Sequence, residues 1–130
     1  MTGAEREVLD AADRLVEAFA AHDRERYFAA FAPDATFVFY TTPEMLNSRD
    51  EWEAEWRRME SEDGFRVLTC TSTEQRVTLA KEAAVFVHRV ATRAEFGGEV
   101  VVSDERETIV FRRDAGRWLA IHEHLSPFPR

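Results

Sequence analysis

The chain has 130 residues, a length typical of one domain, and we expect a single domain over residues 1–130. A hydrophobic content of 45% is enough for a buried core and excludes a globally disordered chain. The formal net charge of -8, with basic residues in no longer run than a pair, argues against a nucleic-acid partner. No apolar stretch approaches the ~18 residues of a membrane span, and the acidic N-terminus does not match a signal peptide. With a lone Cys70, these features favour a cytoplasmic protein.

Three helices are predicted in the first half of the chain. Residues 4–21 place apolar side chains three and four positions apart, which is typical of an amphipathic helix. Thr2 and Glu5 have the spacing of a capping box at its start. A short second helix is expected over 24–31, with Asp23 as its N-cap.

The third helix is predicted to run from Ser48 to about residue 61. Ser48 and Glu51 form a second capping-box pattern. Trp52 and Trp56 lie four positions apart and therefore share one face of this helix. Both tryptophans fit a packed core, and they also fit the wall of a pocket that the helix would cover.

Strand patterns occur over residues 35–40, 65–78, 82–96, 99–113 and 117–126. Helices come first, with one strand between them, and an antiparallel meander follows. This order predicts an α+β fold in which three N-terminal helices pack on an antiparallel sheet. Strands this long twist and form bulges, so we expect a strongly curved sheet whose concave face encloses a pocket.

The turns between the last three strands determine which side chains share a face. If residues 97–99 form a three-residue turn, Arg89 lies opposite Glu107, whereas a two-residue turn sets Arg89 against Arg106. The opposite-charge pairing favours the three-residue turn, and residues 114–116 fit a second one. Both turns together place five polar side chains on one face of three neighbouring strands: His88, Arg106, Thr108, His122 and His124.

These polar side chains predict the floor of a pocket with apolar walls. The expected walls are Phe39, Trp52, Trp56 and Phe86. A simpler interpretation is that His122 and His124 are ordinary hydrogen-bonded members of a sheet and that Arg106 only neutralises Asp104 or Glu107. Burying an arginine without a counter-charge is costly, which favours an anion or carbonyl oxygen bound at Arg106.

A metal or a nucleotide cofactor is not expected. His122 and His124 share a face, and His88 offers a third ligand, but the adjacent Arg106 would repel a cation. The sequence has no glycine-rich phosphate loop and no dinucleotide-binding fingerprint.

Two segments carry a family resemblance. The run YFAAFAPDATFVFY at 27–40 and the ending GRWLAIHEHLSPFP at 116–129 resemble the SnoaL-like branch of the nuclear transport factor 2-like superfamily. The resemblance covers about residues 5–128, and the branch is also similar to the association domain of calcium/calmodulin-dependent kinase. It implies a cone-shaped α+β domain, commonly homodimeric, with a deep pocket between sheet and helices. Relatives include ketosteroid isomerase, polyketide cyclases and scytalone dehydratase, while other members only bind ligands or proteins.

Two functions therefore remain open at the level of sequence. As an isomerase, cyclase or dehydratase, the protein would act on a small apolar carbonyl compound, with Arg106 holding the oxygen and His122 or His124 moving the proton. As a non-catalytic module, it would bind a small organic ligand in the same pocket. The resemblance gives isomerases and cyclases an aspartate base. Asp104 shares the pocket face in the predicted pairing but lies near a strand end, which argues against isomerase or cyclase chemistry.

The opposite face of the sheet is predicted to form a homodimer interface. An extensive apolar sheet face is rarely left exposed in a monomer. The apolar side chains expected on this outer face are Val85, Val87, Ile109, Phe111, Leu119 and Ile121.

Overall fold

The computed structural model describes residues 2–130 as three helices and a five-stranded sheet. The helices are α1 (Gly3–Ala20), α2 (Arg24–Ala29) and α3 (Arg49–Asp63). The strands are β1 (Phe31–Phe39), β2 (Arg66–Ala80), β3 (Ala83–Phe96), β4 (Glu99–Asp114) and β5 (Arg117–Pro127). They lie in the order β1-β5-β4-β3-β2, with every neighbouring pair antiparallel except β1, which runs parallel to β5. The predicted α+β fold is confirmed, whereas the parallel pairing of β1 was not foreseen.

The helix ends follow from local side-chain chemistry. Thr2 and Glu5 make the predicted capping box, each side chain accepting a hydrogen bond from the other residue's backbone N–H. The side chains of Asp23 and Ser48 cap α2 and α3 by accepting hydrogen bonds from the backbone N–H of Arg26 and of Glu51. The Glu51 side chain accepts from the backbone N–H of Asn47, so the second predicted capping box is not reciprocal. Gly64 ends α3 in the left-handed conformation, with φ 64°, which glycine adopts without steric cost.

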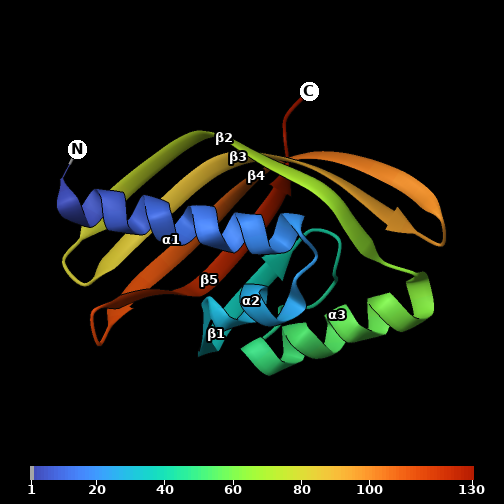
Figure 1. Cartoon of the computed structure of the whole chain (residues 1–130), viewed down its shortest axis with the longest axis horizontal. Coiled ribbons are helices and arrows are strands. Elements are labelled where there is room, and N and C mark those ends of the chain that lie inside the picture. Colours follow the sequence, from blue (N-terminus) through green and yellow to red (C-terminus); the bar gives the residue numbers. More distant parts are fainter. Residues whose placement is uncertain (1) are drawn as a thin grey trace.

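The sheet arches over the helices (Figure 1). In this view α1 crosses in front of β2 and β3, and α3 lies below the far end of the long β3–β4 hairpin. The Gly97 N–H at the tip of that hairpin donates a 2.6 Å hydrogen bond to the carbonyl oxygen of Asp63 at the end of α3. Next to it the rings of Phe65 and Phe96 lie 5.3 Å apart. The hairpin tip and α3 thus close one end of the space between sheet and helices.

Aromatic rings fill much of that space. Trp56 is fully buried, and Tyr27 stacks on it with ring centroids 5.3 Å apart. Phe28 and Phe65 meet the same indole edge-on, at 5.5 Å and 5.1 Å. Edge-on and offset ring pairs of this kind contribute about 0.5–1.5 kcal/mol each beyond their buried area. Trp56 therefore joins α3 to α2 and to the start of β2.

The turns of the last two hairpins contain two residues, so the predicted three-residue turns are wrong. Gly97 and Gly98 have φ values of 60° and 84°, and Ala115 and Gly116 have φ values of 50° and 78°. Positive φ at both central residues defines a type I′ turn, whose twist matches the right-handed twist of the strands it joins. The twist of the sheet outweighed the charge pairing that favoured longer turns.

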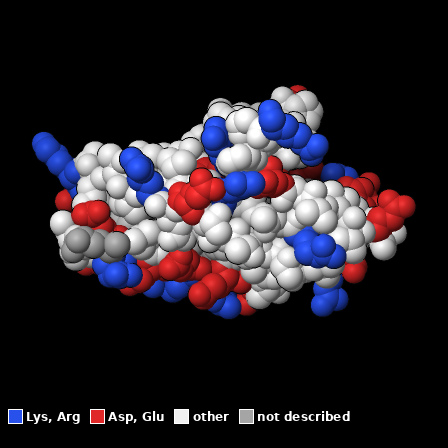
Figure 2. Space-filling model, turned by 90° about the horizontal axis from the view of Figure 1, so that it is seen from above, with Lys and Arg blue, Asp and Glu red and all other residues white. Residues whose placement is uncertain are grey.

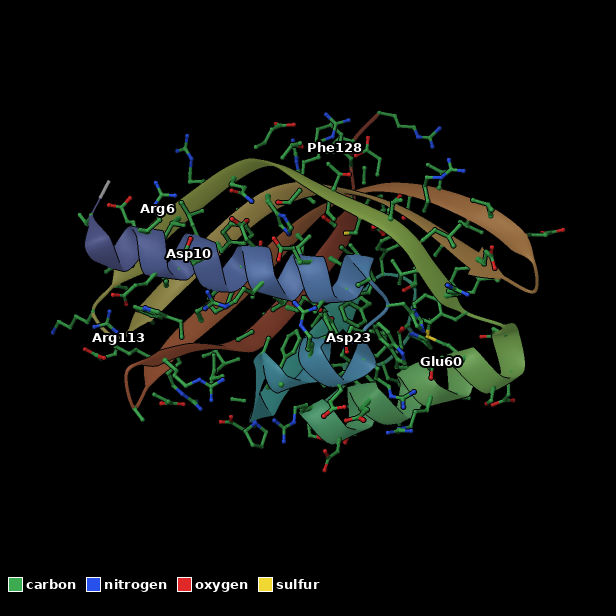
Figure 3. The ribbon with its side chains drawn as sticks, in the orientation of Figure 1. Arg6, Asp10, Asp23, Glu60, Arg113 and Phe128 are labelled. Atoms are coloured by element: carbon green, nitrogen blue, oxygen red, sulfur yellow. The ribbon has the colours of Figure 1, made fainter. Side chains whose placement is uncertain are left out.

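The shorter turn places Arg89 directly opposite Arg106. Two features offset the repulsion between them. The Arg89 guanidinium bonds both carboxylate oxygens of Asp104, and both arginines lie over the ring of Phe128, at 3.8 Å and 4.7 Å from its centroid. Figure 3 shows Phe128 above the arch, on the side away from α3.

The corrected pairing divides the predicted polar cluster between the two faces of the sheet. His88 now lies opposite Glu107, on the inner face covered by the helices. A bulge after Val110 also shifts β5, and Thr108 pairs with His124. Arg106, Thr108, His122 and His124 still share one face, but it is the outer face.

The outer surface carries mixed charge. On the face seen in Figure 2, basic side chains are interspersed with acidic ones and with uncharged residues. Within residues 2–130, no helix is long and apolar enough to cross a membrane.

Candidate functional site

A cavity of about 240 Å³ lies between the inner face of the sheet and helices α1 and α3. Leu15 and Phe19 of α1 line it, as do Trp52 and Met59 of α3. Drug-sized ligands fill pockets of about 300–1,000 Å³, so this cavity suits a smaller organic molecule. Its position follows from the curvature of β2–β4, because a flat sheet would leave no space under the arch.

The charged side chains that reach the cavity are all acidic. In the described part of the chain no Lys, Arg or His lines it, whereas three glutamates do: Glu105, Glu107 and Glu123. The rest of the lining is mainly apolar, with the hydroxyls of Tyr27 and Tyr40 at its inner and outer parts. Carboxylates in an apolar cavity lose most of their hydration, which favours their protonated form.

Glu107 and Glu123 form a hydrogen-bonded carboxyl pair on the neighbouring strands β4 and β5. Glu123 is 3% exposed and the Glu107 side chain is 13% exposed. Burial raises the pKa of Glu107 to about 7, and burial together with the charge of Glu107 raises the pKa of Glu123 well above its usual value. A hydrogen bond between the two carboxyl groups lowers the pKa of Glu107 and raises that of Glu123, so Glu123 is its donor. The pair combines a proton donor with a base poised near pH 7.

Tyr27 fixes the position of Glu123. Its hydroxyl donates a 3.0 Å hydrogen bond to Oε2 of Glu123 and accepts a 3.1 Å hydrogen bond from Nε1 of Trp52. Tyr27 is 2% exposed, and burial, followed by the nearby carboxylates, raises its pKa well above 10. The phenol therefore stays neutral and acts as a hydrogen-bond donor.

His88 contacts Glu107 from behind the cavity. Its Nε2 lies 2.8 Å from Oε1 of Glu107, and its Nδ1 lies 2.6 Å from Oγ of Ser72. His88 is 1% exposed, and burial lowers its pKa to about 4. The imidazole is thus neutral at physiological pH, and one of its nitrogens carries a hydrogen.

Glu105 and Tyr40 lie toward the opening. The Tyr40 hydroxyl donates a 2.5 Å hydrogen bond to Oε2 of Glu105. Glu105 is 6% exposed, while Tyr40 is 49% exposed. Burial raises the pKa of Glu105, and the bond from Tyr40 partly opposes this rise. Burial and the hydrogen bond to Glu105 raise the pKa of Tyr40 to about 12.

The structure places the predicted site residues in three locations. Phe39 and Trp52 line the cavity, as expected. Trp56 of α3 and Phe86 and His88 of β3 are buried in the core but do not line the cavity. The remaining predicted residues lie outside it, on the outer face: Arg106, Thr108, His122 and His124.

The outer-face residues have other contacts. Nδ1 of His122 lies 2.8 Å from Oγ1 of Thr36 on β1, and burial and the neighbouring His124 lower the pKa of His122. His124 and Arg106 are exposed. The expectation that Arg106 binds an anion on the pocket floor is wrong, because Arg106 does not face the pocket.

The sequence prediction missed the paired glutamates. The signal that identifies them is the dipeptide Gly97-Gly98, which is typical of a two-residue type I′ turn. With that turn, Glu107 and Ile109 of β4 pair with the buried His88 and Phe86 of β3 and so share the inner face with them. Within residues 2–130, no group of three or more His, Cys, Asp or Glu is arranged to hold a metal ion.

A protein-family model described as "SnoaL-like domain" matches residues 8–130 of the chain. The chain belongs to the SnoaL-like family. No curated protein matches this SnoaL-like protein. Solved structures with the nuclear transport factor 2-like fold do match it over nearly its whole length.

Three of these structures illustrate the likeness. A putative calcium/calmodulin-dependent protein kinase II association domain from Xanthomonas campestris is 22% identical, with 99% of this chain and 91% of that chain covered and a TM-score of 0.80. An NTF2-like protein from Cytophaga hutchinsonii is 14% identical, with 98% and 100% covered and a TM-score of 0.82. A protein from Catenulispora acidiphila, in complex with S-DNPA, is 16% identical, with 96% and 93% covered and a TM-score of 0.78. At these identities the comparison shows a shared fold.

Proposed function

We propose that this SnoaL-like protein is an enzyme that moves a proton on a small, apolar, uncharged carbonyl compound, with Glu107 and Glu123 as its acid–base pair. The observation that carries this proposal is the buried carboxyl pair at the wall of a mainly apolar cavity. Carboxyl groups with strongly raised pKa values are concentrated at catalytic sites. The ligand named for the Catenulispora acidiphila protein supports a small organic molecule as the occupant.

The pair has the groups that enolisation requires. An ionised Glu107 takes a proton from the carbon next to the carbonyl, and its pKa of about 7 suits a general base at neutral pH. When the substrate binds, the protonated Glu123 turns its O–H from Glu107 to the oxygen on which negative charge develops. Return of the proton to another carbon gives an isomer, and transfer to a departing hydroxyl group gives a dehydrated product.

The lining also selects the charge of the substrate. Three carboxyl groups and no basic side chain of residues 2–130 reach the cavity, so an anionic ligand would meet repulsion without a counter-charge. The aromatic walls, including Phe39 and Trp52, favour an apolar body. We therefore assign the chemistry to carboxyl groups and an uncharged substrate, in place of the His/Arg chemistry expected from the sequence.

A non-catalytic binding module with the same pocket is the second candidate. The hydrogen bonds from Tyr27 to Glu123 and between His88 and Glu107 favour it, because buried polar groups need such partners even without a reaction.

Hydrogen–deuterium exchange next to the carbonyl separates the two candidates. A panel of small cyclic ketones is incubated with the protein in D2O, and exchange at the α-carbon is followed by NMR. We expect catalysed exchange that falls on the order of 100-fold or more in Glu107→Gln and Glu123→Gln. His124→Gln, on the outer face, is the control and keeps the wild-type rate. Ketones that bind without exchange establish the binding module instead.

We also propose a homodimer through the outer face of the sheet. Ile109 and Phe111 were expected on this face but are buried on the inner one. Val85 and Val87 do lie on the outer face, and each is 37% exposed. Light scattering at micromolar concentration tests the proposal: we expect a dimer for the wild type and a monomer for Val87→Glu, and a monomeric wild type excludes it.

A further inference from the structure

A continuous chain of hydrogen bonds leads from the carboxyl pair to the surface. It begins at Glu107 and passes through both ring nitrogens of His88 to Oγ of Ser72, at 2.8 Å and 2.6 Å. Nε2 of Gln75 donates a 2.9 Å hydrogen bond to the same Ser72 oxygen and a 3.1 Å bond to Oδ1 of Asp13 on α1. Gln75 and Asp13 are exposed, and Ser72 is half-buried.

This chain leaves the site in a direction different from the cavity opening. Of its members only Glu107 lines the cavity, whereas Tyr40 and Glu105 mark the opening. The bulge of β2 between Thr73 and Arg76 produces the connection, because the pairing with β3 shifts there. The shift brings the Gln75 amide back onto Ser72.

We propose that His88 and Ser72 form a proton relay that joins Glu107 to solvent at the α1 side of β2. The relay rests on the proposed function, since it restores the protonation state of the base that the reaction uses. His88 and Ser72 act through Glu107 and are positioning residues. A ligand that fills the cavity blocks the direct path for water, and the relay leaves a second path open.

The relay step is balanced in protons. In one state the Ser72 hydroxyl donates to Nδ1 of His88, and Nε2–H donates to the ionised Glu107. The Nε2 proton then passes to the Glu107 oxygen, Nδ1 takes the hydroxyl proton, and Ser72 takes one proton from solvent. Glu107 ends protonated, Nδ1–H donates to Ser72, and one proton has crossed from solvent to the site. The reverse sequence discharges it.

The charges around His88 suit this transfer. Glu123 of β5 and Asp13 of α1 act on the ring in addition to Glu107, and all three groups are acidic. Burial nevertheless keeps the imidazole neutral at physiological pH, so each nitrogen can alternate between donor and acceptor. A permanently charged ring would have no acceptor nitrogen.

The matched variants Ser72→Thr and Ser72→Val test the relay on the intact protein. Thr keeps a hydroxyl, and Val replaces it with a methyl group of similar size in a residue that suits a strand. The infrared carbonyl band of the buried carboxyl groups, assigned by its change in Glu107→Gln, is followed after a rapid pH jump. We expect Ser72→Val to slow the change on the order of 100-fold and to leave its final amplitude unchanged. Ser72→Thr should respond at the wild-type rate.

A rate for Ser72→Val equal to that of the wild type overturns the relay, because protons then reach Glu107 through the cavity opening. A purely structural role for Ser72 predicts a changed final amplitude with no change in rate, which also overturns it. His88→Gln is the second variant: its amide can still bond Glu107 but has no second ring nitrogen, and we expect the same slow response. The proposed function fails separately, through absence of catalysed exchange on the ketone panel, so the two failures are distinguishable.

Discussion

The inner and outer faces of β4 and β5 consist of alternate residues of the same two strands, yet their chemistry is opposite. The inner face combines Glu107 and Glu123 with the fully buried Ile109. The outer face presents Arg106 and His124, both exposed, at the neighbouring positions. Successive side chains of a strand point to opposite faces, so one residue of register decides which set meets the helices.

The acidic residues of the inner face lose more hydration free energy on folding than the basic residues of the outer face. Exposed Arg106 and His124 keep their hydration, whereas Glu107 and Glu123 lose theirs. This loss of hydration raises the pKa values of both glutamates. The hydrogen bonds that Tyr27 makes to Glu123 and His88 makes to Glu107 replace part of the lost hydration. Retaining groups at such a cost favours a role at the cavity over a role in stability alone.

Truncating one side chain on each face of β4 should have very different effects on the free energy of unfolding. Ile109→Ala removes a fully buried side chain and should lower the free energy of unfolding by about 2–5 kcal/mol. Thr108→Ala, one residue away on the outer face, should change it by no more than about 0.5 kcal/mol. Urea denaturation of both variants measures the difference. Equal losses would mean that the outer face is as tightly packed as the inner one.

The helix caps could be predicted from the sequence, whereas the assignment of strand residues to the inner or outer face could not. The helix caps at Thr2, Asp23 and Ser48 are local patterns, and the structure confirms them. The face assignment depends on turn length, a choice of one residue that inverts a whole strand. Charge pairing of Arg89 favoured the wrong choice, because its actual partner Asp104 lies on a diagonal of the sheet.

Other features depend on contacts between distant parts of the chain. The Tyr27–Glu123 hydrogen bond joins residues 96 positions apart, and no local sequence pattern predicts it. The parallel pairing of β1 with β5 likewise joins strands that are separated along the chain by α3 and three further strands. The bulge after Val110 changes the β4–β5 pairing by one residue and has no clear sequence signal.

The buried Glu107 on the inner face should make the stability of the protein depend on pH. Folded Glu107 has a pKa of about 7 against an ordinary value of 4.5, so between these values the folded state binds more protons than the unfolded state. Rising pH therefore destabilises the wild type across this window. Glu107→Gln removes the effect and should gain up to about 3 kcal/mol relative to wild type between pH 5 and pH 8.

Denaturation series at several pH values check this expectation. His88 acts with the opposite sign, because its lowered pKa destabilises the folded state as pH falls from 6.5 toward about 4. That contribution is confined to pH values below 6.5, so the interval from pH 6.5 to pH 8 reports Glu107 alone. Glu99→Gln, which removes an exposed carboxylate from the same strand, is the control and should track the wild type. A Glu107→Gln difference that stays constant with pH would show that Glu107 ionises normally.

The smallest expected effect tests the turn that sets the β4–β5 pairing. Ala115 has φ 50°, a left-handed conformation that is unfavourable for alanine and acceptable for asparagine. Asn-Gly is also the preferred pair for a type I′ turn, so Ala115→Asn should raise the free energy of unfolding by about 0.5–1 kcal/mol. Ala91→Asn, at an exposed position within β3, is the control and should be slightly destabilising, because asparagine is disfavoured in strands. In a three-residue turn Ala115 would have a negative φ, and asparagine would bring no gain. Thermal denaturation of the two variants therefore reports the turn length directly, and a gain confined to position 115 supports the two-residue turn that pairs Asp114 with Arg117 and Phe111 with Ala120.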